Sequence, residues 1–241
     1  MIKGVTFDLE GNWIDGEFAH FQALWHAAKE VGIHFDPNNT AEDMSRRIPN
    51  AIGGGDAVNA EGIARLIDPE APIEEIRRRA MEIRGRKDYF YEAIIEGSDS
   101  IKPREGSMEV FEQIRSRGLP TAIASMTARK HASVLLARSG IGKLFPKHLI
   151  LLGESVKHIK PAPDVYLEAA RRMRIHPCNQ LVFEDSVTGL KAARAAGSPT
   201  VAMPVYISRE NIERLKAENP VRICISWTEI DSAALEALLN I

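Results

Sequence analysis

Residues 2–12 read IKGVTFDLEGN, an apolar and β-branched run that stops at Asp8 and is followed by a short polar loop. The run over residues 2–7 is typical of a buried strand, because β-branched and aromatic side chains suit the covered, pleated surface of a parallel sheet. A charged residue directly after such a strand lies at its carboxyl end, where open α/β sheets bind ligands. The sequence therefore predicts a functional site around Asp8.

Strand and helix patterns alternate from residue 108 to residue 204. The expected helices, which have apolar residues at helical spacing, cover 108–118, 128–140, 162–173 and 187–197. The expected strands, which are short apolar runs, cover 120–125, 148–152, 180–185 and 199–204. Strands that alternate with helices pair in parallel, so the predicted fold class is α/β, with a doubly wound parallel sheet.

The stretch between the first strand and this alternating part reads differently. Residues 18–31 form an amphipathic helical pattern, and residues 41–96 read as helical throughout, with a break at 48–56, IPNAIGGGD. A purely helical stretch between two strand signals predicts an inserted subdomain. We expect an α/β core domain over residues 1–14 and 102–241, and a helical cap domain over residues 15–101.

The composition is that of an ordinary soluble domain. The 241 residues are 44% hydrophobic and 27% charged, with a formal net charge of −2, which gives no basic field for nucleic acid or an anionic membrane. The two cysteines have no metal-ligand spacing, and no segment has the length of a signal-peptide core or a membrane span. We expect a cytoplasmic protein, monomeric or a weak dimer, without nucleic-acid or membrane partners.

A run of basic residues lies within the helical stretch. Arg77 to Arg79, and then Arg84, Arg86 and Lys87, alternate with Glu74, Glu75 and Glu82. Mixed charges of this kind are typical of a solvated helix face, and we expect these side chains in solvent.

Four carboxylates follow the expected strands at one edge of the sheet. Close carboxylates repel one another and raise one another's pKa unless a cation binds between them. Oxygen-rich ligand sets suit a hard divalent ion such as Mg²⁺. The expected metal-site residues are Asp8, Glu10, Glu184 and Asp185.

Anion-binding groups follow two further strands at the same edge. Ser125 ends the strand over 120–125, with Thr127 close by, and Lys160 follows the strand over 148–152. A carboxylate nucleophile, a lysine, hydroxyl donors and a hard metal are the parts that phosphoryl transfer requires, because positioning and charge neutralisation do most of its work.

These residues lie in motifs that resemble those of the haloacid dehalogenase superfamily, within its β-phosphoglucomutase-like group with a helical cap. The family's first motif, FDLDGTLxD, resembles FDLEGNWID, and the remaining motifs resemble IASMT, Lys160-Pro161 and FEDSVTG. Each motif is weak alone. Four in order, each at a strand end and together spanning nearly the whole chain, form a strong signal.

The resemblance implies a role for each matching residue. Asp8 would attack phosphorus to form an aspartyl-phosphate, and Glu10 would protonate the leaving oxygen and then activate water. Magnesium would lie between the Asp8 carboxylate, the backbone carbonyl of Glu10 and Asp185, with Glu184 assisting. The phosphate-binding residues would be Ser125, Met126, Thr127 and Lys160.

The first motif departs from the family pattern at three neighbouring positions. Glu10 stands where the family commonly has Asp, Asn12 replaces Thr and Trp13 replaces Leu. The carboxyl group at position 10 is kept but sits one methylene further out, a scale of displacement to which proton transfer is sensitive. We expect an active enzyme with a shifted geometry, and a slow or non-catalytic binding protein is the alternative.

The cap carries the candidate substrate contacts. IGGGDAV, with its three glycines, occupies the place where related sugar-phosphate enzymes have a substrate-contacting loop, often with an arginine. The candidate residues are His20, Arg47 and Gly54. The ordinary alternatives are a structural histidine, a solvated arginine and a helix-to-helix turn.

The function that these residues favour is a Mg²⁺-dependent phosphatase that acts on a small phosphorylated metabolite, such as a sugar phosphate. A phosphomutase would use the same core residues but needs a cap that binds a second phosphate, and the missing cap-loop arginine disfavours it. A dehalogenase would keep the nucleophile but use no metal, so Glu10, Glu184 and Asp185 weigh against it.

Overall fold

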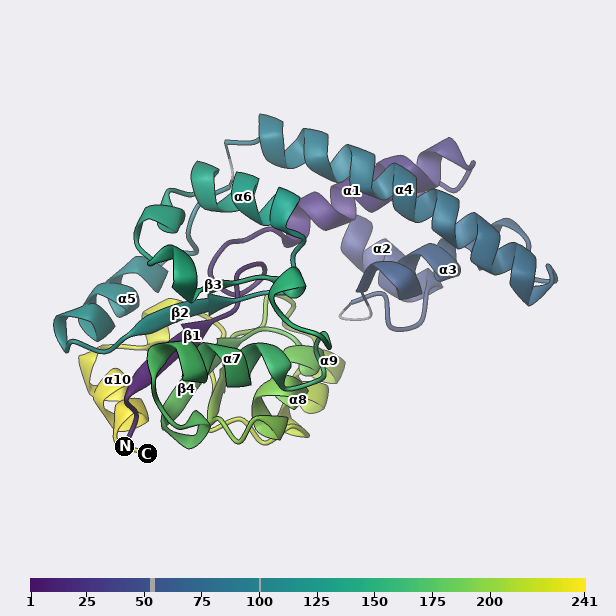
Figure 1. The fold of residues 1–241 in the computed structure, drawn as a ribbon. Helices are drawn as coiled ribbons and strands as arrows, with labels where there is room; N and C mark the ends of the chain where they lie inside the picture. Colours follow the sequence, from purple (N-terminus) through teal and green to yellow (C-terminus); the bar gives the residue numbers. More distant parts are fainter. Residues whose placement is uncertain (53–54, 100) are drawn as a thin grey trace. The chain divides into compact units, whose positions relative to one another are not determined.

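The computed structural model describes residues 1–52, 55–99 and 101–241 (Figure 1). These residues divide into two compact units. The first comprises Met1–Asp15 with Asp99–Ile241, and the second is Gly16–Ser98. No helix within these described stretches combines the length and the apolar character needed to cross a bilayer.

A parallel sheet forms the centre of the first unit. In the described chain it has six strands in the order β3-β2-β1-β4-β5-β6, and every neighbouring pair is parallel. The strands are β1 (Gly4–Phe7), β2 (Thr121–Ala124), β3 (Ile150–Leu151), β4 (Gln180–Glu184), β5 (Thr200–Ala202) and β6 (Arg222–Ile223). This confirms the predicted α/β fold class. The strand order reverses direction at β1 and β4, the place where doubly wound sheets bind ligands.

The pairing register of β1 determines where Asp8 lies relative to the ends of the neighbouring strands. Phe7 pairs with Ile123 of β2 and with Phe183 of β4, and the backbone N–H of Asp8 donates to the Phe183 carbonyl at 3.0 Å. Asp8 therefore leaves the sheet level with the last residues of both neighbouring strands.

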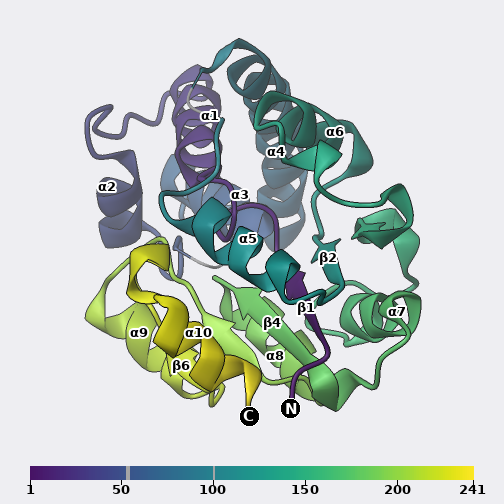
Figure 2. The same cartoon turned by 90° about the vertical axis from the view of Figure 1, so that its left-hand side faces the viewer.

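Helices cover both faces of this sheet. They are α5 (Ser107–Ser116), α6 (Arg129–Arg138), α7 (Asp164–Met173), α8 (Val187–Ala195), α9 (Arg209–Lys216) and α10 (Ser232–Leu239). Figures 1 and 2 show α7 and α8 on one face and α5 and α10 on the other. Small side chains of β2, such as Ala122 and Ala124, let Val165 and Ala169 of α7 pack closely onto the sheet.

The α5 face holds a cluster of aromatic rings directly beneath the site. The ring of Phe7 stacks on Phe183 at 5.4 Å and tilts against Trp13 at 4.7 Å, while Trp227 lies 4.9 Å from Phe183. Such pairs add packing energy beyond their buried area. Because Phe7 and Phe183 immediately precede Asp8 and Glu184, the cluster fixes the strand ends that carry these two carboxylates.

The second unit is helical. It consists of α1 (Glu17–Glu30), α2 (Thr40–Arg47), α3 (Gly55–Ile67) and α4 (Ile73–Gly97) in the described residues. Gly62 of α3 permits a close approach, because a Cβ atom there would lie 2.2 Å from Ile48. Ile76, Ile83 and Tyr91 on the long helix α4 are buried in this unit.

Candidate active site

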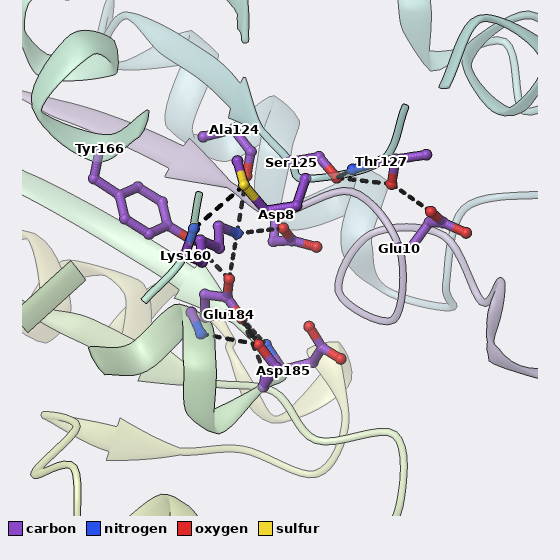
Figure 3. Close-up of polar contacts among 12 residues, drawn as sticks. Asp8, Glu10, Ala124, Ser125, Thr127, Lys160, Tyr166, Glu184 and Asp185 are labelled. Carbon is purple, nitrogen blue, oxygen red and sulfur yellow. Dashed lines mark hydrogen bonds and ion pairs between the residues drawn. The ribbon is translucent and has the colours of Figure 1, made fainter. Parts of the chain in front are cut away.

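The Lys160 ammonium group joins the ends of three strands. Its Nζ donates to Asp8 Oδ1 after β1 at 2.6 Å, to Glu184 Oε1 at the end of β4 at 2.5 Å, and to the Ala124 carbonyl of β2 at 3.2 Å (Figure 3). Only 6% of the lysine side chain is exposed. The structure thus brings together Asp8, Lys160 and Glu184, as the sequence predicts.

The charges in this cluster do not balance. Two buried carboxylates share one ammonium group, which leaves a net negative charge when all three are ionised. Burial raises the pKa of Asp8 to about 7, helped by the charge of Glu184 and opposed by Lys160. The pKa of Lys160 is held well above its ordinary range by the two carboxylates, although burial acts in the opposite direction. The site therefore favours an additional positive charge next to Asp8.

Both carboxylate oxygens of Glu184 accept hydrogen bonds from the protein. Oε1 accepts from Lys160 and from the Tyr166 hydroxyl at 2.8 Å, and Oε2 accepts from the backbone N–H groups of Asp185 and Ser186 and from the Ser186 hydroxyl, each at 3.0 Å. Although burial alone would raise it, the charge of Lys160 and these hydrogen bonds lower the pKa of Glu184. Glu184 therefore anchors Lys160 as a permanent anion.

The glycine of the FEDSVTG motif makes this arrangement possible. A Cβ atom on Gly189 would lie 1.7 Å from Glu184 Oε1, so no other residue fits there. The Ser186 hydroxyl also accepts from the Gly189 N–H at 3.0 Å and caps α8. The motif thus encodes the start of a helix with room for a buried carboxylate.

Asp185 approaches the first loop through another glycine. Gly11 has φ of +74°, which favours glycine, and a Cβ atom there would lie 2.3 Å from Asp185 Oδ2. Figure 3 shows the Asp185 carboxylate turned away from Glu184. The loop after β1 and the loop after β4 are therefore in direct contact at the predicted metal site.

The donor chemistry of these loops fits a magnesium ion. No three His, Cys, Asp or Glu side chains within residues 1–52, 55–99 and 101–241 cluster as ligands. Mg²⁺ usually takes only one or two carboxylates and keeps several waters, so Asp8, Asp185 and a backbone carbonyl suffice as its protein ligands. The saturated carboxylate of Glu184 does not suit direct coordination.

Glu10, Thr127 and Ser125 form a chain of polar contacts beside the lysine cluster. The Thr127 hydroxyl donates to Glu10 Oε2 and lies 2.9 Å from the Ser125 hydroxyl, and the Thr127 N–H donates to Ser125 Oγ at 3.2 Å (Figure 3). Met126 contributes differently, because its Sδ accepts from the Lys160 N–H at 3.4 Å. The residues predicted to bind phosphate thus lie in the loop after β2 and in the loop that carries Lys160.

Arg104 holds the first loop in place, a role that the sequence analysis missed. Its guanidinium donates to the carbonyl of Gly11 at 2.7 Å and to that of Met203, after β5, at 3.0 Å. Burial lowers the pKa of this guanidinium, and the charges of Asp185 and Asp15 oppose the effect. The sequence showed only a linker, KPREG, and an arginine in a linker gives no local signal of burial.

Lys87 corrects the expectation of a fully solvated basic face. Its side chain is 2% exposed, and its Nζ lies 2.7 Å from Asp56 Oδ2 and 4.6 Å from the centre of the Tyr91 ring. His20 stacks on Tyr91 at 4.3 Å, and its Nδ1 lies 3.9 Å from Asp56 Oδ1. The candidate His20 thus belongs to a half-buried polar cluster of the helical unit, in which Lys87 is the buried member.

Arg47 and Gly54 are the other two candidate substrate residues, and the described contacts do not connect either of them to a substrate site. Arg47 donates to the His34 carbonyl at 2.6 Å and covers the Phe35 ring at 4.6 Å, within the helical unit. Gly54 lies outside the described residues. Their predicted contacts with substrate stay predictions.

The doubly wound sheet and the polar groups at its strand ends place the chain among α/β enzymes. The chain belongs to the haloacid dehalogenase-like hydrolase family, whose model matches residues 2–197. This confirms the family and the enzyme class that the motifs predict.

Similar proteins and a similar solved structure agree with this assignment. The chain is 31% identical over 214 residues to protein CbbY (plasmid) of Cupriavidus necator, covering 87% of this chain and 81% of that protein. It is 28% identical over 196 residues to a phosphorylated carbohydrates phosphatase of Thermotoga maritima, covering 81% and 82%. The fold matches a HAD family hydrolase from Deinococcus radiodurans R1, solved with bound phosphate and sodium, with a TM-score of 0.74, 24% identity and coverage of 99% and 97%.

We expect Asp8→Asn to stabilise the metal-free protein at neutral and alkaline pH. The folded-state pKa of about 7 exceeds the ordinary 3.8, so stability that protonated Asp8 contributes is complete below pH 4 and is lost as the pH rises to 7. Melting temperatures in EDTA should favour the variant by several degrees at pH 8 and by less at pH 5. Mg²⁺ should raise the wild-type melting temperature more than that of Asp8→Asn.

Asp99→Asn is the control for this comparison, because Asp99 is fully exposed and contacts Arg138 on the surface, at 3.3 Å. Its melting temperature should follow that of the wild type at both pH values. An Asp8→Asn protein that is less stable than the wild type at pH 8 without metal would show that the cluster carries no excess negative charge.

We expect Arg104→Met to destabilise the fold by about 2–3 kcal/mol, because it leaves partly buried carbonyls of two loops without a donor. The free energy of unfolding in urea measures the effect. Arg117→Met is a matched control, since Arg117 also donates to a carbonyl, that of Gln113 at 2.7 Å, but on the surface, and should cost about 0.5 kcal/mol or less. Equal losses in the two variants would contradict the role given to Arg104.

Proposed function

We propose that this enzyme is a Mg²⁺-dependent phosphatase that hydrolyses a small phosphorylated sugar or a similar metabolite through an aspartyl-phosphate. The observation that carries the proposal is Lys160, buried between Asp8 and Glu184 at the switch point of the sheet. Its contact uses Asp8 Oδ1, and Figure 3 shows the other oxygen, Oδ2, turned away from the ammonium group. The relative named as a phosphorylated carbohydrates phosphatase supports the substrate class.

Asp8 Oδ2 is the nucleophile in this proposal. It attacks phosphorus, the bond between phosphorus and the ester oxygen breaks, and the leaving oxygen takes a proton from Glu10. Glu10 then takes a proton from water, the water oxygen attacks phosphorus, and the bond to Asp8 breaks to release inorganic phosphate. Over the two steps, Glu10 regains the proton that it gave to the leaving oxygen. The phosphoryl group passes from the substrate to Asp8 and then to water.

Lys160 and the metal would each neutralise part of the negative charge at the site. Lys160 keeps Asp8 oriented and meets the negative charge of the phosphoryl oxygens, and its own position is fixed by Glu184 and Tyr166. When bound by Asp8, Asp185 and the Glu10 carbonyl, Mg²⁺ would neutralise the charge that accumulates between carboxylate and phosphoryl group. The raised pKa of Asp8 supports this division, because an added cation favours the ionised nucleophile.

The helical unit Gly16–Ser98 is proposed as the cap that selects the substrate. Its half-buried cluster of Lys87, Asp56 and His20 fixes polar side chains within α1, α3 and α4. The core residues of the site are common to the whole reaction class, so the choice of metabolite must come from elements outside the core.

We expect the purified protein to release inorganic phosphate from a panel of sugar phosphates and from p-nitrophenyl phosphate with Mg²⁺, and not in EDTA. Asp8→Asn removes the nucleophile and should lower kcat on the order of 10³-fold or more. Phosphate release measures hydrolysis, and sugar-phosphate analysis in the same reactions detects isomerisation.

The Asp99→Asn variant should retain full activity, which controls for handling and for the loss of one surface charge. An Asp8→Asn protein as active as the wild type would overturn the nucleophile. A folded wild-type protein that turns over no member of the panel would overturn the phosphatase itself, and isomerised product without free phosphate would assign a mutase.

A further inference from the structure

We infer that Thr127 is a positioning residue that holds the longer side chain of Glu10 for proton transfer. The inference rests on the proposed function, in which Glu10 donates and then accepts a proton. It gives Thr127 a role different from the phosphate contact that the motif predicts. The observation behind it is the hydrogen bond from the Thr127 hydroxyl to Glu10 Oε2.

The Thr127 hydroxyl has a fixed position. Ser125 is buried at the end of β2, and its N–H donates to the Leu151 carbonyl of β3 at 3.0 Å. Ser125 Oγ in turn accepts from the Thr127 N–H at 3.2 Å, which closes a tight turn. These two hydrogen bonds, from Thr127 to Ser125 and from Ser125 to β3, therefore connect Thr127 to the sheet.

Each hydroxyl has one proton, and this determines which group donates and which accepts along the chain from Ser125 through Thr127 to Glu10. Glu10 Oε2 can only accept, both in the ionised carboxylate and in the acid form that carries its proton on Oε1, so the single hydroxyl proton of Thr127 goes to Glu10. In the 2.9 Å contact between the two hydroxyls, Ser125 must then be the donor. With its proton committed to Glu10, Thr127 has none left for a phosphoryl oxygen, whereas Ser125 can rotate its own toward one.

The extra methylene of Glu10 explains why such a contact is needed. Compared with aspartate, glutamate has one more rotatable bond, and so more positions that its carboxylate can occupy. Proton transfer requires the carboxylate within hydrogen-bond reach of the leaving oxygen, and a displacement of about 1 Å can cost on the order of 10²-fold in rate. Figure 3 shows the Glu10 side chain extended to Thr127, a contact that restricts its carboxylate.

A double-mutant cycle of Thr127→Val and Glu10→Asp tests this inference. In the wild-type background, Thr127→Val should lower kcat on the order of tenfold with little change in KM, and Thr127→Ser should restore it, because serine keeps the hydroxyl. Aspartate is too short to reach Thr127, so in the Glu10→Asp background Thr127→Val should change kcat less than twofold. Kinetics use p-nitrophenyl phosphate and the best substrate of the panel.

Thr228→Val supplies a matched control. Thr228 and Ser226 repeat the local geometry, with N–H to Oγ at 3.2 Å and the hydroxyls 2.7 Å apart, but outside the site. This variant should leave kcat and KM unchanged. A Thr127→Val loss that is equal in both backgrounds, or that appears as a raised KM and weaker inhibition by inorganic phosphate, would show that the hydroxyl binds phosphate and would overturn the inference.

Crystal structures of the wild type and of Thr127→Val separate this inference from the proposed function. Glu10 should be ordered on Thr127 in the wild type and displaced or spread over several rotamers in the variant. An unmoved Glu10 would overturn the inference even in an active enzyme. Absent turnover by the wild type would overturn the phosphatase, while the structures still decide whether Thr127 positions Glu10.

Discussion

The site depends on one buried ammonium group shared by two carboxylates. Lys160 lies between Asp8 and Glu184, and each partner reaches it from a different strand end. A buried charge without a partner is costly, so the loops that carry these residues are held together by the need to keep all three in contact. Glu184 serves this need by accepting hydrogen bonds on both carboxylate oxygens, which leaves Asp8 as the member proposed to react.

The remaining geometry follows from fixing the loop after β1 against that cluster. Gly11 lets Asp185 approach the loop, Arg104 ties the loop carbonyls to the strand-end residue Met203, and Trp227 Nε1 donates to the Asn12 carbonyl at 3.1 Å. These contacts come from four separate stretches of the chain. The conformation of the loop thus depends on hydrogen bonds to its backbone carbonyls as much as on its own side chains.

This division explains how much the sequence could predict. Strand ends carry strong local signals, so Asp8, Ser125 and Glu184 were found from short apolar runs that stop at a polar residue. Lys160 was found from the Lys-Pro motif that follows the strand over 148–152. β6 is a two-residue strand with no pattern to detect, and it was missed together with α9 and α10.

Burial of a charged residue is a property of distant partners, and local patterns do not reveal it. Lys87 is buried because Asp56, 31 positions away, meets it, and its neighbours in sequence are exposed charges. For the same reason, the sequence grouped Glu184 with the metal ligands, since it cannot show that backbone N–H groups and Tyr166 already use both of its oxygens.

The three departures in the first motif are accommodated by different parts of the structure. Trp13 packs into the aromatic cluster, 4.9 Å from Phe111, and Glu10 is met by Thr127. The side-chain amide of Asn12 is buried with no hydrogen-bond partner in the described part of the chain, a cost of about 1–3 kcal/mol that nothing in the structure explains. Local rules are broken most often where function constrains the chain, so a loop that combines a compensated acid with an uncompensated amide is shaped by its chemistry more than by stability.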